Sequence, residues 1–116
     1  MITFTPKHFA GRDEAIAQIN ESGLYLAEAE ISQDGLTSDA HVHPYQVDIY
    51  LLDGVLELDE PDAGQRHVLK AGSKAVVPSG TLHAETCPGR FHAVFGVSVD
   101  PVPIMAVRAS EAPSRP

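Results

Sequence analysis

Short apolar segments separated by turn residues make up most of the chain after residue 23. Residues 24–31 alternate loosely between apolar and polar side chains, as expected of a strand that buries one face. Similar segments recur at regular spacing as far as residue 107, which gives eight or nine predicted strands. Short strands with turns between them are typical of an antiparallel sandwich or barrel. The pattern therefore predicts an all-β fold.

Two turns stand out within this series of strands. Asp53-Gly54 follows the apolar run at 49–52 and predicts a tight hairpin, because glycine readily adopts the positive φ that such turns require. The run Pro-Asp-Ala-Gly at 61–64 predicts a second turn before the strand at 65–70.

The pattern before residue 24 is different. Residues 2–9 predict an edge strand or an arm, since Pro6 has no N–H group to donate to a neighbouring strand. Residues 11–22 place apolar side chains at helical spacing and end at Gly23, which predicts one short helix.

Together these patterns divide the chain into three parts. We expect an N-terminal arm and short helix at 1–23, a β-barrel at 24–108 and a flexible C-terminal tail at 109–116. The tail is polar and contains two prolines, so it is expected to fray.

Composition narrows the class of protein. The formal net charge of −8 argues against binding to nucleic acid or to an anionic membrane surface. A single cysteine, Cys87, excludes an intramolecular disulfide and suits a reducing compartment. The first residues lack the apolar run of a signal peptide, and no apolar stretch approaches the length of a membrane span. We therefore expect a cytoplasmic protein.

The triplet His41-Val42-His43 carries the clearest chemical signal in the chain. In an extended strand, side chains two residues apart project from the same face. The two imidazoles can then converge on one point above the sheet, and a metal ion is the usual occupant of such a point.

The surroundings of this triplet resemble the first motif of the cupin family, written G-x5-H-x-H-x3-4-E-x6-G. The matching residues are Gly35, His41, His43, then Asp48 in place of glutamate, and Gly54.

A second segment is similar to the second cupin motif, written G-x5-P-x-G-x2-H-x3-N. The matching residues are Gly72, Pro78, Gly80 and His83, with Cys87 where the motif has asparagine. The two motifs in register make the resemblance far more specific than an isolated H-x-H.

The resemblance implies a cupin double-stranded β-helix, or jelly-roll barrel, with a metal inside it. It implies His41, His43 and His83 as ligands, with an acid from the first motif as the fourth. Such a set suits a divalent first-row transition metal such as Fe, Mn, Ni or Zn.

The identity of the acid is open. Asp48 is our prediction, and a bulge or bend near Pro44 is then needed to turn it inward. Gln46 is an alternative oxygen ligand. Counting back from the motif glycine would instead place Val47 at the acid position and leave no carboxylate.

The resemblance leaves two classes of function. The first is a metal-dependent enzyme of dioxygenase, isomerase or lyase type that acts on a small polar organic substrate, with His92 and Tyr50 as candidate acid–base residues. His67 is a further strand histidine, although an outward or hydrogen-bonded side chain is the simpler interpretation of either histidine. The alternative is a non-catalytic cupin that binds or senses a small ligand. Small single-domain cupins are commonly homodimers, so we expect a homodimer here.

Overall fold

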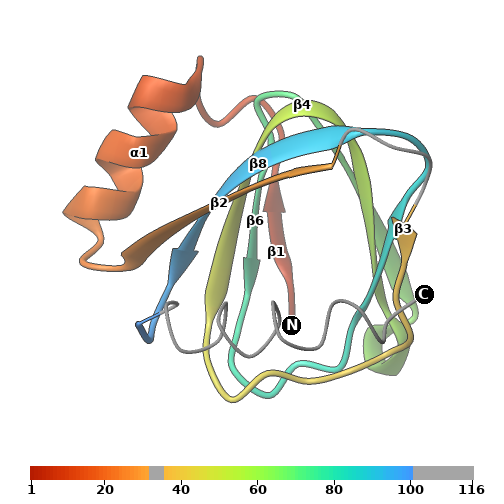
Figure 1. The fold of residues 1–116 in the computed structure, drawn as a ribbon. Helices are drawn as coiled ribbons and strands as arrows, with labels where there is room; N and C mark the ends of the chain where they lie inside the picture. Colours follow the sequence, from red (N-terminus) through yellow and green to blue (C-terminus); the bar gives the residue numbers. More distant parts are fainter. Residues whose placement is uncertain (32–35, 101–116) are drawn as a thin grey trace, which may run out of the picture.

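The structure is a computed structural model that describes residues 1–31 and 36–100 (Figure 1). The turn expected at residues 32–35, the strand expected at 102–107 and the tail at 109–116 lie outside the described residues. The elements in chain order are β1 (Thr3–Thr5), α1 (Arg12–Glu21), β2 (Tyr25–Ile31), β3 (Leu36–Thr37), β4 (Val47–Glu60), the 3₁₀ turn η1 (Pro61–Ala63), β5 (Gln65–Lys70), β6 (Lys74–Val77), β7 (Ala84–Cys87) and β8 (Phe91–Val97). The expected mostly-β fold with one short N-terminal helix is confirmed.

Strand β4 is long enough to belong to both layers of the structure. Its first half pairs with β6 and β8, which in turn pair with β1 and β2. We call these strands, with the first half of β4, the first sheet. Its second half pairs with β5 and β7, and β7 also pairs with β3. All of these pairings are antiparallel. The result is a curled β-sandwich in which β4 bends from one sheet into the other (Figure 1).

The hairpin predicted at Asp53-Gly54 is wrong, because β4 continues through both residues. A register shift between Leu51 and Asp53 in the pairing with β8 shows a bulge at this point. Gly54 has a φ of 84°, and a Cβ atom there would lie 2.0 Å from the carbonyl oxygen of Arg90. The glycine therefore permits a close crossing of β8 over a bent strand rather than a reversal of the chain.

The first sheet has apolar side chains on both of its faces. Its inner face contributes to the main core, and we call the region that this core fills the barrel interior. The core includes Ile49, Leu51, Leu56, Leu58, Leu69, Cys87, Phe91 and Ala93. Its outer face is covered by α1, where Ile19 and Ala15 pack with Tyr50 and Val94. Figure 1 shows the helix outside the barrel, beside β2 and β8. Alternate residues of β4 therefore point to two different cores.

Helix α1 forms where the apolar spacing predicted it. It begins after Gly11 and ends before Ser22, and its two fully buried side chains are Ala15 and Ile19. Gly23 follows with a φ of 76°, as expected of a glycine that ends a helix. Among the described residues, no helix is long and apolar enough to cross a membrane.

Candidate metal centre

His41 and His43 lie in the segment that precedes β4, and only His41 has a strand-like pairing. It forms an isolated antiparallel bridge with His83. The two residues exchange backbone hydrogen bonds: the His41 N–H donates to the His83 carbonyl at 2.8 Å, and the His83 N–H donates to the His41 carbonyl at 3.0 Å. This bridge fixes two imidazoles from distant parts of the sequence side by side.

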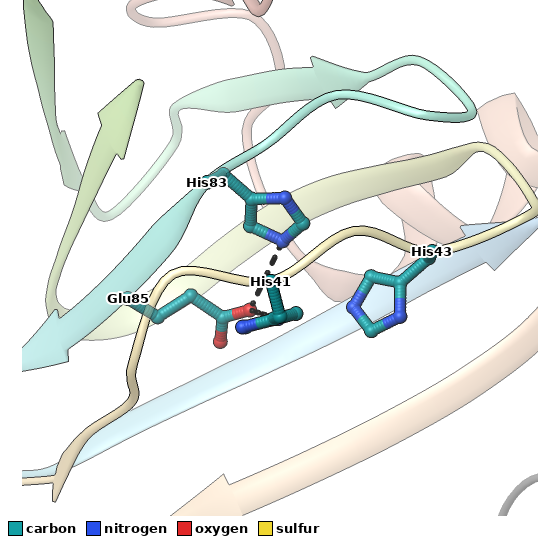
Figure 2. A group of neighbouring side chains, drawn as sticks. All are labelled: His41, His43, His83 and Glu85. Carbon is teal, nitrogen blue, oxygen red and sulfur yellow. Dashed lines mark ion pairs between the residues drawn. The ribbon is translucent and has the colours of Figure 1, made fainter. Parts of the chain in front are cut away.

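The three predicted histidine ligands come together, as Figure 2 shows. The ring centroids of His41 and His43 are 4.7 Å apart, and those of His41 and His83 are 4.5 Å apart. The centroids of His43 and His83 are separated by 5.2 Å. These rings meet from different segments of the chain, as the two motifs together predict.

Glu85 supplies the carboxylate of this group. Its Oε1 atom lies 3.5 Å from Nε2 of His83 and 3.7 Å from Nε2 of His41. One possible ligand atom from each of the three histidines and Glu85 lies within 4.8 Å of the others. The sequence analysis missed Glu85, although it follows His83 by two residues at the start of β7 and so projects from the same face.

Backbone carbonyls orient two of the imidazoles. Nδ1 of His41 lies 2.7 Å from the Asp39 oxygen, and Nδ1 of His83 lies 2.9 Å from the Thr81 oxygen. Since a carbonyl only accepts, each Nδ1 carries a hydrogen, and in the neutral imidazole each Nε2 is then left with a lone pair. Nε2 of His41 is buried and makes no hydrogen bond. A buried acceptor in this position fits a metal ion, which would accept that lone pair.

His83 is the most deeply placed of the four residues, with 3% of its side chain exposed. Burial lowers the pKa of its imidazole. The interaction with Glu85, the hydrogen bond to the Thr81 backbone and the negative charge of Glu60 outweigh burial, so the pKa is raised above 6.5. The environment of His83 is therefore negative and favours a cation, whether a proton or a metal.

Comparison with known families agrees with this geometry. Residues 27–100 match the family described as the cupin domain, and this segment contains all four residues of the centre. The chain belongs to the cupin family. No curated protein gives a significant match.

Solved structures share this cupin fold. A conserved protein of unknown function from Streptococcus pyogenes aligns with a TM-score of 0.54 and 21% identity, over 66% of this chain and 63% of that chain. A cupin superfamily protein from Desulfitobacterium hafniense aligns with a TM-score of 0.55 and 15% identity, over 86% of this chain and 78% of that chain. A polyketide cyclase from Streptomyces resistomycificus aligns with a TM-score of 0.52 and 30% identity, over 63% of this chain and 51% of that chain. The chain thus spans less than two thirds of the Streptococcus and Streptomyces proteins.

Asp48 does not belong to the centre of this cupin. It lies on β4 one residue from Val47 and Ile49, which face the barrel interior, so its own side chain takes the opposite face. There its carboxylate accepts a hydrogen bond from the Gln46 amide at 2.9 Å and lies 3.8 Å from the Lys74 ammonium group. The bulge in β4 comes after Asp48 rather than near Pro44, so it does not turn Asp48 inward.

Tyr50 and His92, the two predicted acid–base residues, also lie on the outer face of the first sheet. Tyr50 is 1% exposed and packs beneath α1, with Phe9 in a T-shaped ring contact. His92 alternates along β8 with Phe91 and Ala93 of the interior, and its Nε2 contacts the carboxylate of Glu28. Neither side chain is a member of the group around His83.

Proposed function

We propose that this cupin holds a divalent first-row transition metal through His41, His43, His83 and Glu85 and is a metal-dependent enzyme on a small polar organic substrate. The observation that supports this most is the buried Nε2 of His41, which has no hydrogen-bond partner and lies beside two further imidazoles and a carboxylate. A set of three nitrogens and one oxygen suits Fe, Mn, Ni or Zn.

The chain's own residues prepare the site for such an ion. The carbonyls of Asp39 and Thr81 hold the imidazoles of His41 and His83 in one tautomer, with the lone pairs directed inward. A bound ion would supply Lewis acidity, which polarises an oxygen atom of the substrate. The His41–His83 bridge fixes these two side chains, so little rearrangement is needed for binding.

One similar protein bears on whether this cupin is an enzyme. The similar Streptomyces protein is a polyketide cyclase, which supports an enzyme rather than a non-catalytic binding protein. Within the enzyme proposal we keep dioxygenase, isomerase and lyase chemistry. A redox-active ion is needed for the first, and zinc suffices for the other two.

Metal analysis of the purified protein tests the binding half of the proposal. We expect about one ion per chain in the wild type and its loss in His83→Ala, because that substitution removes a ligand. His92→Ala is the matched control, since it removes an imidazole from the outer face, and it should keep the metal. Equal metal content in all three proteins would contradict the proposal.

Turnover tests the enzyme half. Metal-loaded wild type and His83→Ala are incubated with a mixture of small metabolites, and mass spectrometry follows the depletion of any component. The proposal expects a compound that is consumed, with a new product, by the wild type alone. A compound that is bound but recovered unchanged would instead identify a binding protein.

A further inference from the structure

A second carboxylate, that of Glu60, lies in the barrel interior. Glu60 is the last residue of β4 and is 5% exposed. Its Oε1 accepts a hydrogen bond from the backbone N–H of Ile2 at 2.9 Å, and Ile2 is buried as well. The exposed N-terminal amine lies 3.7 Å from Oε2, where water weakens its attraction. Buried charged groups are usually paired or hydrogen-bonded, as Glu60 is to Ile2.

The strand register places Glu60 on the same face as the metal centre. Leu58 pairs with Glu85 across β4 and β7, and Asp59 pairs with Ala84. Cross-strand partners point to the same side, and so do residues two apart on one strand. Glu60 therefore shares the face of Leu58, and through Leu58 it shares the face of Glu85 and His83.

His67 completes this arrangement from the other side of β4. It is the partner of Leu58 on β5, so it too faces inward. Its Nε2 is 3.9 Å from Oε1 of Glu60, and this nitrogen is buried with no hydrogen-bond partner. Because β4 lies between β5 and β7, Glu60 is placed between the strand of His67 and the strand of Glu85.

We propose that Glu60 determines the charge of the ligand that this site accepts, so that neutral or singly charged oxygen chelators bind in preference to dianions. This rests on the metal site proposed above. A divalent ion with Glu85 and Glu60 carries no net charge in a poorly solvated interior. A dianionic chelator would therefore leave the site strongly negative. A singly charged enolate or hydroxamate, or a neutral hydroxyketone, would not. The substrate class is then a singly charged or neutral oxygen chelator rather than a dicarboxylate.

Two chelators of different charge test this proposal. Acetohydroxamate binds metals as a monoanion through two oxygens, and oxalate binds through two oxygens as a dianion. Both are titrated into the Co(II)-loaded full chain, and the visible absorption of Co(II) gives the two dissociation constants. The measured quantity is the ratio of the oxalate constant to the acetohydroxamate constant.

Three variants isolate the charge of Glu60. Glu60→Gln keeps an oxygen that can accept from Ile2 but removes the charge. Glu60→Asp keeps the charge on a shorter side chain. Asp59→Asn removes a charge from the neighbouring residue, whose carboxylate faces the other way and pairs with Arg66 at 2.6 Å. Circular dichroism checks that each variant is folded.

We expect the ratio to fall by about tenfold in Glu60→Gln, because the charge of Glu60 repels the dianion more than the monoanion and an intermediate dielectric constant gives a difference of that order. Glu60→Asp and Asp59→Asn should keep the wild-type ratio. An unchanged ratio in a Co(II)-loaded Glu60→Gln protein overturns this inference and leaves the metal site standing, as does an equal fall in Asp59→Asn. A wild type that binds no Co(II) overturns the metal site, and this inference with it.

Discussion

At the scale of single residues, the metal centre depends on which carboxylate lies beside the histidines. Glu85 has its Oε1 within 3.7 Å of the Nε2 atoms of both His41 and His83. Asp48 instead accepts a hydrogen bond from Gln46 and pairs with Lys74 on the outer face. Each acid follows a motif histidine by only a few residues. What distinguishes them is the face of the sheet from which each side chain projects.

We expect Glu85→Gln to weaken metal binding by at least about tenfold, because even partners outside the ligand shell typically contribute 10–100-fold. Asp48→Asn, the matched control, should bind metal as the wild type does. Competition titration with a coloured chelator measures both affinities. A loss of metal in Asp48→Asn alone would restore the acid predicted from the sequence and remove Glu85 from the site.

The histidines could be predicted from the sequence, but the face on which Asp48 lies could not, for one physical reason. The two motifs fix His41, His43 and His83 by spacing alone. The side on which Asp48 lies depends on counting alternate residues from His43, and the segment between them is not a regular strand until Val47. Counting alternate residues does not give the face of a side chain across an irregular segment. Glu85 could have been predicted, because it follows His83 by two residues and side chains two apart in an extended segment share a face.

At the scale of elements, β4 joins the two sheets and carries both faces of the barrel. Before the bulge, residues 47, 49 and 51 face the interior; after it, residues 56, 58 and 60 do. The strand pattern predicted two strands with a hairpin between them. A glycine with positive φ serves a turn or a bulge equally well, and only the approach of β8 distinguishes the two.

Gly54→Ala should destabilise the protein by about 3 kcal/mol or more, because the new Cβ overlaps the Arg90 backbone and cannot move away. Gly64→Ala is a matched control: it also has positive φ, at 62°, but nothing lies within 4 Å of its Cβ position. It should lose only about 1 kcal/mol. Urea denaturation measures both. Equal losses would mean that φ, rather than the crossing of β8, fixes Gly54.

A group of side-chain contacts joins α1 to strands β2 and β8. Arg12 of the helix donates two hydrogen bonds to Glu28 of β2, and His92 of β8 contacts the same carboxylate. Hydrogen bonds from Arg12 and His92 lower the pKa of Glu28 to about 2. A lowered pKa stabilises the folded protein above the ordinary value of 4.5, and this contribution is lost as the pH falls toward 2.

Glu28→Gln should therefore lower the Tm by about 2 °C near neutral pH, a small effect because the pair is exposed. Near pH 3 the difference from the wild type should shrink to less than about half of that. Thermal denaturation followed by circular dichroism gives both values. Glu21→Gln removes an exposed charge from the same helix and serves as control. A difference that grows toward acid pH would contradict the assigned pKa.

At the scale of the whole molecule, the first sheet separates two cores with different tasks. The core under α1 contains Ile19, Tyr50 and Val94. His92 lies on the same side of the sheet. The interior core contains Leu58, whose partner on β7 is the metal-centre residue Glu85. Stability should depend on both cores, whereas metal binding should depend on the interior one alone.

Truncating one leucine-sized side chain in each core tests this separation. Ile19 and Leu58 are both fully buried, so Ile19→Ala and Leu58→Ala should each cost about 2–5 kcal/mol of unfolding free energy. Well below either Tm, Ile19→Ala should bind metal as the wild type does, because the sheet lies between its cavity and the site. Leu58→Ala should bind about tenfold more weakly, since Glu85 and His67 lose the side chain that packs between them. Isothermal titration with Zn(II) compares them, and equal weakening in both variants would show that the two cores act as one.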